Sequence, residues 1–109
     1  MRVLLFQARF GPYHRARLRT ARPFFAARGA ELIGVQIASS DQYDWMTEET
    51  DNETLLTAFP SARYEDLSGR QIAVAVNKLL MEHDPECVVV NGYAATEAIG
   101  GITWCRARG

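Results

Sequence analysis

Short runs of apolar residues alternate with longer stretches in which apolar residues recur at helical spacing. Residues 3–8, 31–38 and 86–91 are nearly continuous apolar runs, which is the pattern of strands buried on both faces of a sheet. Residues 53–59 contain a pair of leucines and fit either a strand or a short helix. The chain therefore has three predicted strands and one segment that is either a further strand or a helix.

The first predicted helix covers residues 13–28, where apolar side chains fall mostly at helical spacing with arginines on the opposite face. Pro23 lies inside this stretch, so we expect the helix to bend or to be interrupted there. Gly29 follows the last arginine and predicts the end of the helix, because glycine readily adopts the left-handed conformation of helix caps.

Two more helices are predicted in the second half of the chain. Residues 60–65 form a connection, and either Asp66 or Ser68 caps the start of a helix that runs to about His83. The apolar stripe of this helix consists of Ile72, Val76, Leu79 and Leu80. The last helix is predicted at residues 95–108.

The order strand, helix, strand, strand, helix, strand, helix predicts an α/β fold. Right-handed crossovers give a Rossmann-like open parallel sheet of about four strands in the order 3-2-1-4, with helices on both faces and one domain over residues 1–109. In this order the last strand lies at an edge of the sheet. Its residues Val88-Val89-Val90 nevertheless have the composition of a central strand. An exposed apolar edge strand promotes aggregation, and natural domains normally cover it. We therefore expect an incomplete domain whose C-terminal side is missing.

Charge is distributed unevenly along the chain. Arginines concentrate in the first quarter and carboxylates in the second, and the formal net charge is -1. This balance gives no general attraction to nucleic acid or to an anionic membrane, and no nucleic-acid partner is expected. We interpret the two charged stretches as solvated surfaces in preference to a dedicated polyanion site.

The remaining composition excludes several kinds of site. Cys87 and Cys105 are far apart and lack metal-type spacing, so we expect both to be small core residues in a reducing compartment. No stretch has the ~18 apolar residues of a membrane span, and the N-terminus lacks a signal-peptide cleavage site, which predicts a cytoplasmic protein. Phosphate-cradling glycine motifs and metal-ligand clusters are absent from the sequence. No cofactor and no metal are predicted.

Two loops that follow predicted strands carry the candidate binding residues. Ligands of open α/β sheets bind beyond the carboxyl ends of the strands, where the first and last strands of this chain diverge. Gly11 allows close approach of a ligand, and His14 offers a ring nitrogen to a hydroxyl or a phosphate. Asn91, Gly92 and Tyr93 offer an amide, a flexible backbone and a ring for sugar stacking. Each candidate also has an alternative interpretation without a ligand. Gly11 then only separates a strand from a helix, His14 is a surface histidine without a role, and residues 91–93 form an ordinary turn.

The residues of both loops resemble one enzyme family. Residues 2–14, Arg-Val-Leu-Leu-Phe-Gln-Ala-Arg-Phe-Gly-Pro-Tyr-His, and residues 84–93, Asp-Pro-Glu-Cys-Val-Val-Val-Asn-Gly-Tyr, resemble the N-terminal, acceptor-side domain of GT-B glycosyltransferases of the retaining family 4 type. The resemblance implies a nucleotide-sugar donor, held mainly by a C-terminal domain that is missing here, and a small-molecule or glycan acceptor. It assigns acceptor binding to Gly11, His14 and residues 91–93, and it implies that the isolated chain is inactive. Many relatives have a Gly-Gly pair where this chain has Phe10-Gly11-Pro12.

A second hypothesis belongs to a different class of protein. The chain also fits a complete, small, flavodoxin-like module that binds a ligand or partner without catalysis. Its receiver-like version is disfavoured, because the first strand ends in Gln7-Ala8-Arg9 where a receiver needs acidic residues.

Overall fold

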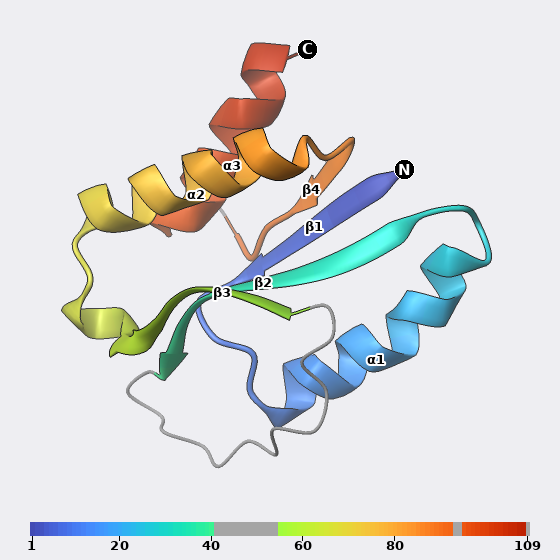
Figure 1. The fold of residues 1–109 in the computed structure, drawn as a ribbon, viewed down its shortest axis with the longest axis horizontal. Helices are drawn as coiled ribbons and strands as arrows, with labels where there is room; N and C mark the ends of the chain where they lie inside the picture. The colour runs from blue at the N-terminus through green and yellow to red at the C-terminus, as the bar shows by residue number, and fades with distance from the viewer. Residues whose placement is uncertain (41–54, 93–94, 109) are drawn as a thin grey trace.

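A computed structural model describes residues 1–40, 55–92 and 95–108 of the chain. Strands and helices alternate in these ranges (Figure 1). In chain order the elements are β1 (Arg2–Gln7), α1 (Pro12–Ala26), β2 (Glu31–Ser40), β3 (Leu55–Arg63), the 3-10 turn η1 (Tyr64–Asp66), α2 (Gly69–His83), β4 (Cys87–Val89) and α3 (Thr96–Arg108).

The four strands form one parallel sheet in the order β3-β2-β1-β4, which confirms the predicted topology. Residues Arg2 to Gln7 of β1 pair with Glu31 to Gln36 of β2, while Val3 to Leu5 pair with the three residues of β4. Helix α1 covers one face of the sheet, and α2 and α3 cover the other (Figure 1). The arrangement is Rossmann-like.

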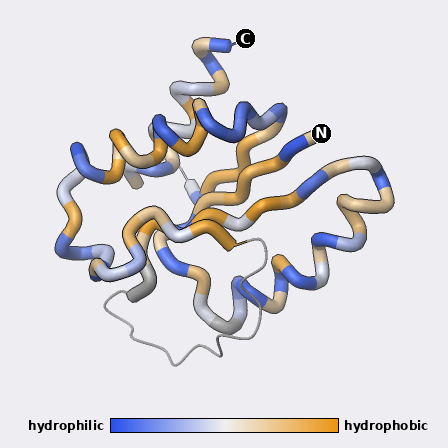
Figure 2. The backbone as a smooth tube through the Cα atoms, in the orientation of Figure 1, coloured by the Kyte–Doolittle hydropathy of each residue, from blue (hydrophilic) through white to orange (hydrophobic). Residues whose placement is uncertain are grey.

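Alternating side chains of the strands fill a core on each face. Figure 2 shows the strands as the most continuously hydrophobic part of the chain, whereas the helices alternate between polar and apolar residues. The core under α2 contains Leu4, Phe6, Ile33, Val35, Ile37, Ile72, Val76 and Leu80. The core under α1 contains Val3, Phe10, Leu18, Ala30 and Leu32. Each fully buried large side chain contributes roughly 1.5–3 kcal/mol, so these two layers hold the sandwich together.

Helix α1 continues through Pro23, so the predicted interruption is wrong. An internal proline removes one helical hydrogen bond and costs about 3 kcal/mol. Leu18 before it is buried and Phe25 after it packs on the same core, so contacts with the sheet fix the helix on both sides of the proline. Gly29 has a φ of 74°, which confirms its predicted left-handed conformation beyond the helix.

The segment at residues 53–59, which fitted either a strand or a short helix, belongs to strand β3 from Leu55 onward. The strand extends through Pro60 to Arg63. The predicted connection at residues 60–65 is therefore wrong for residues 60–63. Proline lacks the N–H that a strand donates, and it is tolerated here because β3 is an edge strand of the sheet.

Helix α2 begins with a reciprocal capping box. The Ser68 hydroxyl accepts a hydrogen bond from the Gln71 backbone N–H at 3.1 Å, and the Gln71 side chain accepts one from the Ser68 N–H at 2.8 Å. Such a box satisfies two helix N–H groups that otherwise lack partners. Of the two predicted caps, the structure selects Ser68 over Asp66.

Helix α3 lies close to β4 because glycine faces the strand. A Cβ atom built on Gly101 would lie 3.0 Å from methyl groups of both Val88 and Val90. Cys87 is partly buried and packs against the core under α1, but Cys105 is exposed, so its predicted core position is wrong. Helix α3 buries Glu97, Ala98 and Gly101, and Trp104 packs against the core under α2, whereas Cys105 is exposed.

Candidate functional site

The candidate site lies at the carboxyl edge of the sheet, between the ends of β1 and β4. The chain leaves β1 toward α1 on one face and leaves β4 toward α3 on the other (Figure 1). Neighbouring parallel strands whose connections depart to opposite faces leave a crevice between their carboxyl ends, and ligands of this fold class bind there.

A buried glutamine holds the loop after β1. Gln36 on β2 is 5% exposed, and its Oε1 accepts a hydrogen bond from the Phe10 N–H at 3.0 Å. Its Nε2 donates to the Thr57 hydroxyl on β3 at 2.8 Å. One amide therefore ties the loop across β2 to the neighbouring strand, and it uses both its donor and its acceptor.

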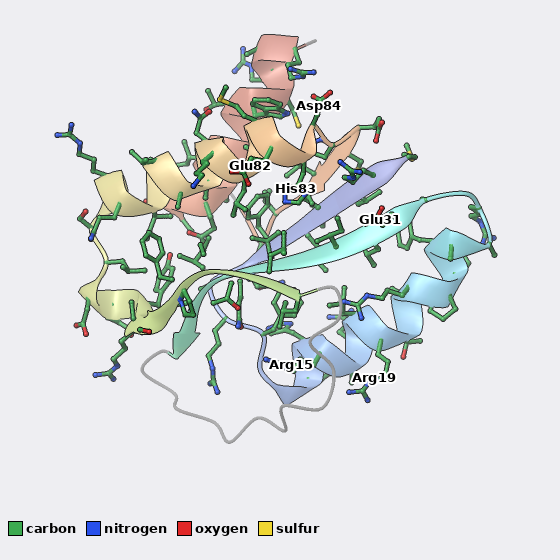
Figure 3. The ribbon with its side chains drawn as sticks, in the orientation of Figure 1. Arg15, Arg19, Glu31, Glu82, His83 and Asp84 are labelled. Carbon is green, nitrogen blue, oxygen red and sulfur yellow. The ribbon has the colours of Figure 1, made fainter. Side chains whose placement is uncertain are left out.

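The start of α1 adds a second restraint to the same loop. Arg15 donates from Nε to the Phe10 carbonyl at 3.0 Å, and Figure 3 shows Arg15 at the beginning of the helix. Arg9, beside Phe10, is buried. A fixed loop that carries positive charge favours an anionic or strongly polar ligand.

Gly11 is the residue that precedes α1. Its carbonyl accepts the Arg15 N–H at 3.0 Å, and its φ of -74° is ordinary for any residue. A Cβ atom at this position would meet no described residue within 4 Å. Among the residues that the structure describes, neither backbone strain nor packing therefore requires a glycine at position 11.

His14 lies in the first turn of α1 and is partly exposed. Its ring makes edge-to-face contacts with Phe10, at a centroid distance of 6.2 Å, and with Tyr13, at 5.8 Å. These contacts fix the plane of the imidazole ring. Among the described residues, no hydrogen bond or ring contact joins His14 to the loop after β4.

The loop after β4 contributes Asn91 and Gly92. Asn91 donates from Nδ2 to the Gln7 Oε1 at 3.4 Å, which brings polar side chains from the ends of β4 and β1 together. Gly92 has a φ of 77°, a conformation that costs other residues about 1 kcal/mol or more. Tyr93, the third candidate of this loop, lies outside the described residues.

A buried carboxylate stands nearby, and the sequence analysis did not find it. Glu97 in the first turn of α3 is 6% exposed, and it accepts hydrogen bonds from the Tyr64 hydroxyl at 3.0 and 3.3 Å. Burial, then the hydrogen bond to Glu97 and its negative charge, raise the pKa of Tyr64 to about 12. The N-terminal end of a helix also favours a carboxylate. The pair connects η1 to α3 and borders the carboxyl edge of the sheet.

A polar cluster at the opposite edge of the sheet has a structural role. Arg2 donates from Nη1 to the His83 carbonyl at 2.7 Å, and its backbone N–H donates to the Glu86 carboxylate. The hydrogen bond from the Arg2 N–H is the main cause that lowers the pKa of Glu86. Figure 3 places His83 at this end of the molecule with Glu31 and Asp84. The cluster joins the starts of β1 and β4, away from the edge where such folds bind ligands.

A groove is formed on the other side of the sheet. It has a volume of about 580 Å³, runs between β3 and α2, and includes Phe59, Val74, Lys78 and Leu79 in its walls. None of the described candidate residues lines this groove.

The chemistry available at the site is hydrogen bonding. Residues 1–40, 55–92 and 95–108 contain no group of three His, Cys, Asp or Glu side chains that could hold a metal ion. The polar groups at the edge are amides, a guanidinium, an imidazole and a carboxylate–phenol pair. Such groups position hydroxyl-rich or anionic ligands through donors and acceptors.

No family model, curated protein or solved structure matches this chain. In the part of the chain that the structure describes, none of the helices is long and apolar enough to cross a membrane.

Proposed function

We propose that this chain forms the acceptor-side domain of a glycosyltransferase that transfers a sugar from a nucleotide-sugar donor. The observation that carries the proposal is the contact between Asn91 and Gln7 at the ends of β4 and β1. Side-chain amides both donate and accept hydrogen bonds, as sugar hydroxyls do. The pair lies at the strand-order switch, where this fold class binds its ligands.

Two features of the neighbouring loops support a sugar ligand. No described residue would contact a Cβ atom at Gly11, and Gly92 is exposed with a positive φ. Both loops therefore present backbone groups that a polar ligand can use. The restraints from Gln36 and Arg15 hold the first loop in place before a ligand arrives. Pre-organised positioning is the main contribution that an acceptor domain makes to transfer.

In this proposal the nucleotide-sugar donor binds mainly to a second domain. The chain contributes acceptor positioning through Asn91, Gly92, Tyr93 and His14, with Gly11 shaping the floor of the cleft. Because the donor site belongs to the second domain in this proposal, the isolated chain is expected to be inactive. The resemblance of residues 2–14 and 84–93 to family 4 GT-B enzymes points to the same reaction.

The test is a titration of the ¹⁵N-labelled chain with glucose, N-acetylglucosamine and their methyl glycosides, followed by amide chemical shifts. We expect weak, millimolar binding with shifts confined to residues 7–14 and 91–97. Asn91→Ala should remove these shifts. The matched control Asn77→Ala, on the exposed face of α2, should leave them unchanged. Sugar shifts located elsewhere, or flavin mononucleotide shifting the same edge when no sugar does, would contradict the proposal and favour a non-catalytic binding module.

A further inference from the structure

Helix α1 carries positive charge without any compensating acid on its own element. The first thirty residues of the chain include seven arginines and no aspartate or glutamate. Arg17 and Arg19 on α1 and Arg28 just after it are exposed. Figure 3 shows Arg15 and Arg19 along the helix, with Arg19 on the side away from the sheet. The surface of α1 is thus cationic although the whole chain has a formal net charge of -1.

Large aromatic side chains are exposed on the same helix. Tyr13 is 68% exposed and Phe24 is 56% exposed, although burial of such rings is strongly favoured. They lie at the two ends of a shallow groove of about 480 Å³, which is lined by Tyr13, Ala16, Arg17, Thr20, Ala21 and Phe24. Tyr13 and Phe24 are eleven residues apart in the chain, which corresponds to about 17 Å along the helix axis. The groove therefore follows one side of α1 as a strip along the surface.

The arginines and the aromatic rings of this strip are paired. The Arg17 guanidinium lies 5.2 Å from the centroid of the Tyr13 ring, and that of Arg28 lies 3.6 Å from the Phe24 centroid. Cation–π contacts hold each guanidinium beside its ring on the outer surface. Each pair thus presents an apolar body next to a cationic group.

We propose that this strip of α1 docks the protein on the surface of an anionic lipid membrane. A helix with arginines beside exposed aromatic residues binds in the plane of the interface, where rings enter the headgroup–acyl boundary and guanidinium groups meet lipid phosphates. The attraction to an anionic surface comes from the local charge of α1 and not from the net charge of the chain. Because Gly11 immediately precedes α1, docking holds the candidate site near the lipid headgroups.

The experiment is co-sedimentation of the full chain with vesicles of equal parts phosphatidylglycerol and phosphatidylcholine, compared with vesicles of phosphatidylcholine alone. We expect binding to the anionic vesicles that weakens as salt is raised, since salt screens the charges. An arginine near an anionic surface strengthens binding about five-fold, so Arg17→Gln with Arg28→Gln should weaken it about twenty-five-fold. Phe24→Ser should weaken it about ten-fold, because roughly half of the ring is available for burial.

Matched changes on α2 serve as controls. Arg70→Gln with Lys78→Gln removes two exposed cations from the other face, and Val74→Ser removes an apolar side chain of similar exposure. Neither should change vesicle binding, and circular dichroism melts should show that all variants are folded. The proposal is overturned if anionic vesicles do not bind, or if the α1 and α2 variants behave alike. Equal binding to heparin or duplex DNA, unaffected by Phe24→Ser, would identify a general polyanion site instead.

Discussion

Replacing Gln36 with leucine tests how the candidate loop is held in place. The wild-type amide joins the buried N–H of Phe10 to the hydroxyl of Thr57. Leucine has a similar volume, so packing is largely kept while both hydrogen bonds are lost. Phe10 is 1% exposed, so water has little access to the N–H group that loses its partner.

The expected cost follows from three contributions. The buried N–H of Phe10 without a partner costs roughly 2 kcal/mol, and the lost bond to Thr57 costs about 1 kcal/mol. The more apolar side chain regains about 1 kcal/mol. The net destabilisation of Gln36→Leu is therefore about 2 kcal/mol. With a urea m-value near ~1.5 kcal/mol/M for a chain of this size, the unfolding midpoint should fall by about 1.3 M.

Two assays separate a local effect from a global one. Urea unfolding followed by circular dichroism gives the change in midpoint at constant m-value. Amide hydrogen exchange should show Phe10 losing about thirty-fold in protection, which corresponds to about 2 kcal/mol. Thr57→Val should cost only about 1 kcal/mol, and Asn77→Leu on the exposed face of α2 should stay within about 0.5 kcal/mol. An unchanged midpoint together with unchanged Phe10 exchange in Gln36→Leu would refute this account of the loop.

Two further changes test the packing and the titration of the fold. Gly34→Ala should lower the stability by about 1–2 kcal/mol in urea unfolding, because its Cβ would lie 2.7 Å from a methyl group of the buried Leu18. Gly69→Ala is the neutral control, because its Cβ would make only an ordinary contact. Equal unfolding midpoints for the two variants would contradict this reasoning.

The pKa of Tyr64 is raised from 10.0 to about 12 in the folded protein. The neutral phenol therefore contributes stability that is complete below pH 10 and is lost as the pH rises through 12. The shift corresponds to a nominal ~2.7 kcal/mol, which solvent screening reduces to about 1 kcal/mol. Tyr64→Phe loses the bond to Glu97, so its deficit against wild type should shrink over that interval, and a deficit independent of pH would refute the assignment.

Most of the fold is predictable because the sequence pattern of each strand and helix agrees with its place in the sheet or against it. Apolar runs and helical stripes indicate the strands, the helices and their order. The errors arise where tertiary contacts override a local preference. Pro23 lies within α1 because the helix is fixed to the sheet on both sides, and Pro60 lies within β3 because that strand is an edge. Cys105 is exposed because α3 faces the sheet and the core with Ala98, Gly101 and Trp104, which leaves position 105 outside that face.

The candidate site is less predictable than the fold because its contacts join residues far apart in the chain. Parallel topology was enough to place Gly11 and Asn91 after adjacent strands, since carboxyl ends of parallel strands share one edge. It gave no reason to choose Gln36, which lies in the middle of an apolar strand. A polar residue inside a predicted buried strand was the available signal, because such a group needs a partner.

Glu97 illustrates the limit of reasoning from one helix at a time. Its position in the first turn of α3 is favourable for a carboxylate whether or not it has a partner, so an exposed helix-end acid is the natural sequence interpretation. Its carboxylate accepts a hydrogen bond from Tyr64, which η1 supplies from 33 residues earlier. The same 3-10 turn also leads directly to the Ser68 cap of α2. The Tyr64–Glu97 bond therefore couples the start of α3 to the start of α2, and a change at either residue should reach the carboxyl edge of the sheet as well as the core beneath it.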